Sequence, residues 1–303
     1  MVEVWLLSIA LLFSMHQVSV RVGTLRADTL NGTLVSIATT ALIFSVISLF
    51  FVLRGLRLNG NFLAVMVLAG LLHFFLARTV FYQCISRLGA NVAATLATTR
   101  IFFAAVLGYV LLGETVSVKL ALAGILVFSG VCVLTFQVVS DLYGIALGLA
   151  TGFLTAFASV FAKEGMVRFP GIESAAAGTA VGYIASLVAF LIFLNVVRNV
   201  RCVVGCVGGA RVERVESLKK EIRRYCPFFA GGVFVGFGHL LRYVALSYYS
   251  VCMVETFVSM YPLFTYLLSG IFVRRAEVFS LRFFASACLI LAGAVVLLSP
   301  VKL

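Results

Sequence analysis

The chain has 303 residues, of which 63% are apolar and only 11% are charged, and its mean hydropathy is +1.16. This composition excludes a soluble domain, because too few polar side chains are present to cover a water-exposed surface. The formal net charge of +12 comes without a nucleic-acid-binding motif. We therefore interpret this charge as one that orients a protein in a membrane, and we expect no nucleic-acid partner.

Ten apolar segments follow one another along the chain, and each is long enough to cross the hydrocarbon core of a bilayer as a helix. The sequence therefore predicts an all-α integral membrane protein with ten transmembrane helices. We expect the first segment to be retained as a helix, because no basic residue precedes its apolar run. The segments are 4–20, 33–53, 62–83, 91–112, 118–137, 142–162, 174–197, 227–246, 251–273 and 279–299.

An internal repeat relates the two halves of this series. A shift of 166 positions superposes His73 on His239, and after a three-residue gap a shift of 163 positions continues the match, so that residues 70–134 correspond to residues 236–297. Self-similarity at this scale inside an apolar chain is typical of transporters.

The repeat predicts two units of five helices, 1–140 and 141–303. An odd number of helices in each unit forces the second unit to be inverted, so that the units meet about a pseudo-twofold axis in the membrane plane. A site near the midplane can then open to either side. Glycines such as Gly178 and Gly182 fit surfaces that slide past each other, and equally the static close packing of any helix bundle.

The connection at 198–226 is the longest, and it carries eight Lys and Arg residues against three Glu residues. Its apolar residues fall near one helical face, which is the pattern of a short helix on anionic lipid headgroups. A solvated linker that carries topogenic charge explains the same residues equally well. The distribution of basic residues over the connections places this segment in the cytoplasm and both termini outside.

Three polar side chains fall in the middle of predicted helices, where an unpaired polar group is costly. His73 and His239 are equivalent across the repeat, so inversion brings both toward the axis. They are either cavity residues that hydrogen-bond a substrate or accept a coupling proton, or satisfied structural imidazoles. Arg100 needs an acidic partner or an anionic ligand. The repeat geometry makes Glu255 the candidate partner, and a structural pair and a substrate clamp both remain open.

Arg78 and Arg242 also belong to the predicted substrate path, although each lies about five residues from a predicted helix end. At that distance a long side chain can extend to the membrane interface, so snorkelling accounts for both without a functional role. Together with Arg100 they favour an anionic or zwitterionic substrate.

A second group of residues is predicted to form hinges or gates. Pro262 in the ninth segment frees a backbone carbonyl and permits a hinge, and Tyr261 and Tyr266 flank it. Glu114 and Glu277 are repeat equivalents at points where helices leave the membrane. They form either gate-side ion pairs or plain solvated termini.

Enzymatic chemistry is not expected. The chain has no Asp-Asp pair, no His-Glu-x-x-His motif, no Gly-x-Ser-x-Gly motif and no Gly-x-x-x-x-Gly-Lys-Ser/Thr loop. Its seven cysteines do not have the spacing of a zinc motif. We therefore predict no catalytic residue, no metal and no cofactor.

Several local motifs recur in the two halves or mark their ends. They are the run Gly144, Gly148 and Gly152, the pairs Gly113-Glu114 and Ala276-Glu277, the glycines Gly124, Gly130 and Gly293, and the Pro-containing segment 260–265. With these motifs, the chain resembles the EamA group of the drug/metabolite transporter superfamily over nearly its whole length. The resemblance implies secondary transport by alternating access, with helices 3, 4, 8 and 9 around a central cavity. It also implies cytoplasmic termini, which is opposite to the charge distribution, so the orientation stays open.

The sequence thus predicts a secondary-active permease or exporter in the cell membrane, a monomer or weak homodimer that moves a small polar metabolite such as an amino acid or organic anion. A coupling proton or counter-solute would drive it, since no ATP-binding loop is present. The alternative is a flippase that passes a lipid-linked or amphipathic substrate through the same cavity with a lateral opening to the bilayer.

Overall fold

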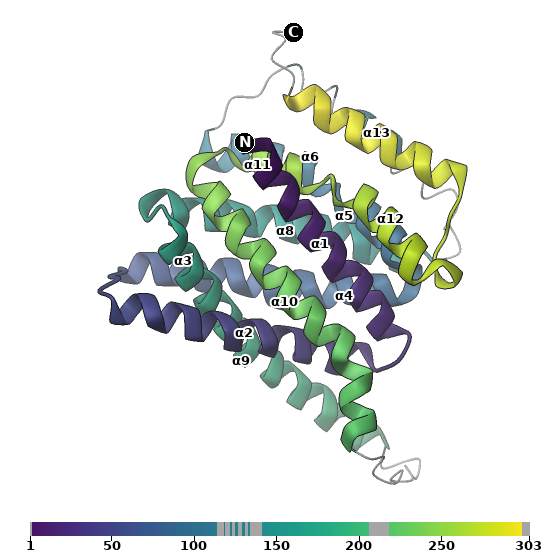
Figure 1. The fold of residues 1–303 in the computed structure, drawn as a ribbon, viewed down its shortest axis with the longest axis horizontal. Coiled ribbons are helices and arrows are strands. Elements are labelled where there is room, and N and C mark those ends of the chain that lie inside the picture. Colours follow the sequence, from purple (N-terminus) through teal and green to yellow (C-terminus); the bar gives the residue numbers. More distant parts are fainter. Residues whose placement is uncertain are drawn as a thin grey trace.

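The structure is a computed structural model that describes residues 2–113, 118, 122, 125, 126, 129, 130, 133, 141–205 and 218–298. Every regular element in these ranges is a helix (Figure 1). The elements are α1 (Val2–Thr24), α2 (Thr29–Leu53), α3 (Gly60–Gly70), the π-helix η1 (Leu71–Ala77), α4 (Arg78–Leu88), α5 (Ala90–Ala97), α6 (Arg100–Leu112), α8 (Leu142–Arg168), α9 (Ile172–Gly205), α10 (Leu218–Tyr248), α11 (Val251–Val258), α12 (Tyr261–Phe272), the 3₁₀-helix η2 (Arg274–Ala276) and α13 (Leu281–Leu298).

Within the described residues, eight helical stretches are long and apolar enough to cross a membrane. They correspond to eight of the ten predicted segments. The predicted segment 118–137 lies mostly outside the described residues, and the last predicted segment coincides with α13, whose apolar stretch Leu281–Gly293 is shorter. Of the basic connection at 198–226, the described parts are helical extensions of α9 and α10.

Polar side chains fix where several helices begin. Asn59 accepts a hydrogen bond from the backbone N–H of Phe62 at 2.8 Å at the start of α3. Asp141 does the same for Gly144 at 2.9 Å at the start of α8, and Ser250 for Met253 at 3.2 Å at the start of α11. These caps satisfy N–H groups that have no partner within the helix, so the turns between spans are encoded by single residues.

Three of the spans are interrupted near their centres. The span Gly60–Leu88 contains the π-helix η1. The span Ala90–Leu112 breaks between α5 and α6, and the span Val251–Phe272 breaks between α11 and α12. Irregular backbone at membrane depth is tolerated where it is buried in protein or lines a cavity, so these breaks indicate where an internal site lies.

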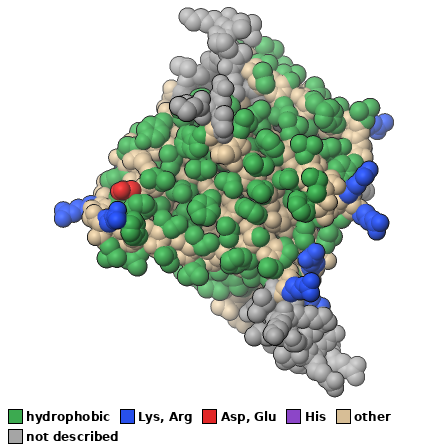
Figure 2. Space-filling view, viewed as in Figure 1, with side chains coloured by type: hydrophobic (Ala, Val, Ile, Leu, Met, Phe, Trp, Pro, Cys, Tyr) green, Lys and Arg blue, Asp and Glu red, His purple; other side chains and the backbone are tan. Residues whose placement is uncertain are grey.

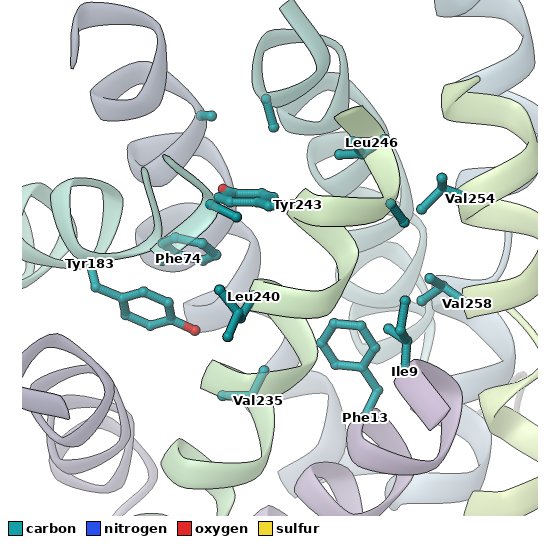
Figure 3. Packing of buried hydrophobic residues seen from close by; sticks show 14 of the residues in the cluster. Ile9, Phe13, Phe74, Tyr183, Val235, Leu240, Tyr243, Leu246, Val254 and Val258 are labelled. Carbon is teal, nitrogen blue, oxygen red and sulfur yellow. The ribbon is translucent and has the colours of Figure 1, made fainter. Parts of the chain in front are cut away.

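The most extensive helix contacts join the first half of the chain to the second half. α1 packs along α10, α2 along α9, and α8 packs against α3, α4 and α6; Figure 1 shows α1 and α10 running side by side across the bundle. A hydrophobic core of side chains from these helices lies between them (Figure 3). The halves therefore interlock, and the core lies between them as well as within each.

The surface has the distribution expected for contact with lipid. Apolar side chains cover the middle of the face drawn in Figure 2, and Lys and Arg side chains gather at its edges. Large apolar residues such as Leu42, Val46 and Leu53 are exposed by 69%, 64% and 79%, which would be costly in water and is favourable in a bilayer.

Candidate substrate site

A small cavity of about 50 Å³ lies inside the bundle where the interrupted helices meet α1, α8 and α10. In this conformation its volume accommodates a few water molecules, and a metabolite would need the cavity to widen. Nine of its fourteen lining residues have polar side chains, which is unusual for the interior of an apolar bundle. The polar lining residues are His16, Gln17, His73, Arg78, Arg100, Thr151, Thr155, His239 and Tyr261.

Beside the cavity, Glu255 forms the centre of a buried ionic network. Its side chain is 0% exposed, and its Oε1 accepts hydrogen bonds from Arg242 Nε at 2.9 Å and from Ser159 Oγ at 3.0 Å. Arg100 Nε lies 3.4 Å from Oε2 of the same carboxylate. The predicted proximity of Arg100 and Glu255 is therefore present in the structure. The network also contains Arg242, so one carboxylate is shared by two guanidinium groups from opposite halves of the chain.

Arg78 lies at the first position of α4, directly after the π-helix. Its guanidinium donates a hydrogen bond to the hydroxyl of Tyr183 on α9 and lies 4.7 Å from the centroid of that ring. Phe74 stacks on Tyr183 with ring centroids 3.9 Å apart, as Figure 3 shows. Aromatic faces attract a cation, so these two rings hold the guanidinium inside the bundle.

The snorkelling interpretation of Arg78 and Arg242 is wrong. The two residues are 5% and 0% exposed, and neither side chain extends to the membrane interface. The continuous helix formed by α3, η1 and α4 ends at Leu88, so Arg78 lies well inside it. Arg242 is close to the end of α10, but the next helix folds back beside it and brings Glu255 to the same depth.

The two repeat-related histidines meet at the cavity, as the sequence predicts. His73 belongs to η1 and His239 to α10, and their ring centroids are 4.6 Å apart. The Nδ1 atom of His73 is 3.3 Å from a guanidinium nitrogen of Arg242. Among the described residues, the Nδ1 atom of His239 has no hydrogen-bond partner, so it is available to a molecule in the cavity.

His16 and Gln17 are site residues that the sequence analysis did not include. They are 4% and 3% exposed and line the cavity. The first predicted segment ended at residue 20, which placed them near an interface, whereas α1 continues to Thr24. The polar stripe Thr151, Thr155 and Ser159 on α8 was also missed, although its four-residue spacing marks one helical face.

The predicted hinge residues divide into two groups. Tyr261 lines the cavity, donates a hydrogen bond from its hydroxyl to Ala94 O at 3.1 Å, and holds the Arg100 guanidinium 4.6 Å from its ring centroid. Pro262 lies in the first turn of α12, directly after the break in the span. Tyr266 instead stacks on Phe283 of α13, with ring centroids 5.2 Å apart, and is not among the cavity-lining residues.

Glu277 is buried at one end of the bundle. Its carboxylate accepts hydrogen bonds from the backbone N–H groups of Ala90 and Asn91 at 2.9 Å each, and it pairs with Arg21 Nε at 2.8 Å. The interpretation as a solvated terminus is therefore wrong for this residue. Burial raises the pKa of Glu277, an effect that the two backbone hydrogen bonds and Arg21 oppose. Its repeat equivalent, Glu114, lies outside the described residues.

At the start of α8, an exposed ion pair joins the halves. Asp141 Oδ2 lies 2.8 Å from Arg87 Nε. The hydrogen bond from Arg87, together with the capping bond from Gly144, lowers the pKa of Asp141. Among the described residues, no group of three His, Cys, Asp or Glu side chains is arranged to hold a metal ion.

Comparison with known proteins agrees with this architecture. Residues 1–136 match the model of the EamA-like transporter family. The predicted resemblance is thus confirmed over residues 1–136. Proteins of that family are transporters and not enzymes, and together with the eight helical stretches that can cross a membrane this match identifies a multi-pass integral membrane transporter.

Solved structures extend the similarity to the whole fold. One crystal structure, titled only as that of a protein, superposes with a TM-score of 0.62 and 14% sequence identity, covering 97% of this chain and 95% of the other. At this identity the similarity concerns the fold alone. No curated protein matches the sequence.

Proposed function

We propose that this EamA-like transporter is secondary-active and moves a small polar metabolite, such as an organic anion or an amino acid, through the central cavity by alternating access. The observation that carries the proposal is the set of buried charged side chains from both halves at and beside the central cavity. Arg100 and Glu255 are 6% and 0% exposed, and Arg242 is 0% exposed. Ionisable residues inside a membrane protein are costly and mark solute pathways.

The helix contacts support an inverted repeat. When each helix of the first half is exchanged for its counterpart in the second, α1 becomes α8, α2 becomes α9, α3 and α4 become α10, and α6 becomes α12. The contact of α1 with α10 then becomes that of α8 with α3 and α4, and the contact of α1 with α12 becomes that of α8 with α6. This exchange is what a pseudo-twofold axis produces, and it fits two units related by inversion.

At each end of the proposed pathway a basic side chain donates hydrogen bonds to backbone carbonyls of a neighbouring helix, and we call such a contact a clamp. Arg21, near the end of α1, donates to Ile85 O at 3.0 Å, and Lys163, in the corresponding part of α8, donates to Leu246 O at 2.9 Å and to Tyr249 O at 2.8 Å. Inversion places these clamps on opposite sides of the membrane. In the proposed mechanism one clamp opens while the other stays closed, and Pro262 and the break before α6 absorb the bending.

The histidine pair offers a means of energy coupling. His73 and His239 lie in contact at the cavity, and an imidazole that becomes hydrated when the cavity opens changes protonation in the physiological pH range. Uptake of a proton by this pair during one half of the cycle would link solute movement to the proton gradient.

The experiment that tests the proposal is solute counterflow in proteoliposomes. Saturable, carrier-dependent exchange of a soluble solute is expected. His73→Ala, Arg100→Ala and His239→Ala should fold and lose exchange, whereas the exposed-site variant Arg54→Ala should retain it. Unchanged exchange in all three cavity variants would contradict the assignment of the site.

An apolar groove gives the flippase alternative a specific basis. It has a volume of about 230 Å³, lies between α1, α10 and α12, and is lined by side chains such as Met15, Val18, Phe234 and Leu268. A lipid tail could occupy such a groove while a polar headgroup crosses the bundle. Thermal stabilisation only by lipid-linked compounds, with no counterflow of soluble solutes, would favour this alternative.

A further inference from the structure

The charges that face the central cavity are unbalanced. Arg78 and Arg100 line it, whereas among the described residues no Asp or Glu side chain does. Arg242 and Glu255 lie behind the wall and neutralise each other in a direct ion pair. The three buried guanidinium groups of Arg78, Arg100 and Arg242 thus stand against the one carboxylate of Glu255, which contacts Arg100 and Arg242, and their sum is two positive charges.

Both cavity arginines also keep an unused hydrogen-bond donor. Nη1 of Arg78 and Nη2 of Arg100 are buried and have no hydrogen-bond partner among the described residues. The two residues are 5% and 6% exposed, so bulk water does not replace the missing partner. A buried charged donor without a partner is strongly unfavourable, and an anionic ligand supplies what each group lacks.

The surroundings fix the direction of both guanidinium groups. Arg78 lies against the rings of Phe74 and Tyr183, with its Cζ 5.7 Å and 4.7 Å from the centroids. Arg100 lies 4.6 Å from the ring centroid of Tyr261 and bonds through Nε to Ser259 at 3.2 Å. The Glu255 carboxylate also lies 3.4 Å from Arg100 Nε. These groups hold one side of each guanidinium, and Arg78 Nη1 and Arg100 Nη2 stay available to a ligand.

From this arrangement we propose that the transported solute is a small organic acid carrying two negative charges, a dicarboxylate or a phosphate monoester, whose acidic oxygens bind Arg78 and Arg100. This inference rests on the proposed transport function. It selects between the substrate classes that the function leaves open. The ammonium group of an amino acid needs an acidic acceptor, and the described part of the cavity wall provides only neutral ones such as Gln17 and Thr155.

The test compares the charge classes on the intact protein. Purified protein is heated with malonate, succinate, glycerol 3-phosphate or inorganic phosphate, with the zwitterions alanine, serine and glutamine, and with putrescine. A ligand that binds only the folded state raises the melting temperature in a concentration-dependent manner. We expect a saturable increase with the dianions and none with the zwitterions or putrescine. Comparison of malonate and succinate with glycerol 3-phosphate and inorganic phosphate distinguishes the carboxylate from the phosphate form.

Variants then test the two contacts. Arg78→Gln and Arg100→Gln should each weaken dianion binding by about tenfold or more, the consequence of losing one charge-assisted hydrogen bond. Arg100→Lys, which keeps the charge, should lose less than Arg100→Gln. The matched control is Arg54→Gln at an exposed position, where binding should be unchanged. Dianion affinity that is equal in all four variants and the unmodified protein would overturn the assignment.

The transport function and the substrate class can be contradicted separately. Counterflow and stabilisation by zwitterions but not by dianions would overturn the substrate class while transport stands. Stabilisation by dianions without counterflow of any solute would support the anion site and contradict transport. No stabilisation by any acid would overturn the inference, because the ligand-specificity measurement needs no variant to fold.

Discussion

Replacing Glu255 by Gln tests how the buried network is held together. The substitution keeps the shape of the side chain and removes the charge that Arg242 and Arg100 share. Both Glu255 and Arg242 are 0% exposed, and Arg242 Nε donates a hydrogen bond of 2.9 Å to Glu255 Oε1. A Gln carbonyl can accept one of these bonds, but it cannot neutralise either guanidinium.

The burial of Glu255 and Arg242 sets the size of the stability loss expected for Glu255→Gln. Removing one partner of a buried ion pair costs about 3 to 5 kcal/mol, because the remaining charge is left uncompensated away from water. The matched control is Glu164→Gln, whose partner Arg168 and own side chain are 55% and 43% exposed. An exposed pair contributes at most about 1 kcal/mol, so the two Glu→Gln changes should differ severalfold.

The assay is reversible unfolding in mixed micelles, with the free energy of unfolding measured for each variant. A double-mutant cycle with Arg242→Gln separates the pairwise interaction from the rest. We expect the double variant to lose less stability than the sum of the single losses, by about 2 kcal/mol, near the upper part of the range for neighbouring residues. Additive losses, or a Glu255→Gln change as small as that of Glu164→Gln, would refute the reasoning.

Three further predictions address the packing, the buried carboxylate and the clamp. Gly70→Ala should lower stability by about 1 to 3 kcal/mol through overpacking, since its new Cβ would lie 2.4 Å from Gly182 Cα, whereas Gly60→Ala meets no atom within 4 Å and should be tolerated. Because the folded state raises the pKa of Glu277 above its ordinary 4.5, wild type should lose stability relative to Glu277→Gln as pH rises above 4.5, and equal pH profiles would contradict this. Arg21 donates a hydrogen bond to Ile85 O, next to the buried Cys84. Arg21→Gln removes this contact and should speed modification of the Cys84 thiol by a small polar reagent, whereas Arg26→Gln at an exposed position should leave the rate unchanged.

The sequence predicted the members of the site better than their partners. The repeat alignment brought His73 and His239 together, because equivalent positions of an inverted repeat approach the same axis. The hairpin between α10 and α11 also contained the information that pairs Arg242 with Glu255, since both lie a similar number of residues from the turn at Tyr249. It was missed because each residue was judged by its distance from a helix end.

Helix lengths explain the remaining errors. A window of about 20 apolar residues treats a span as a straight rod of bilayer thickness, but α1 and α8 extend beyond the apolar run into polar residues. This extension moves His16 and Gln17 from the interface to the cavity. The breaks were only partly encoded: Pro262 marks the one before α12, whereas Thr98 and Thr99 mark its counterpart before α6 without any proline. At that break their hydroxyl groups donate to backbone oxygens of Thr95 and Leu96, which replaces helical hydrogen bonding.

The π-helix is the feature that sequence reasoning could not supply, and it determines the geometry of the site. His73 and Arg78 are five residues apart, and in a regular α-helix they would point about 140° away from each other, given 3.6 residues per turn. A π-helix joins residue i to residue i+5, so residues five apart lie close to the same face. Through η1, His73 and Arg78 both face the cavity. The wider turn begins just after Gly70, where Ser186 on α9 donates a hydrogen bond to the Gly70 carbonyl at 2.9 Å. The close crossing with Gly182 thus fixes the backbone from which both cavity-lining residues project.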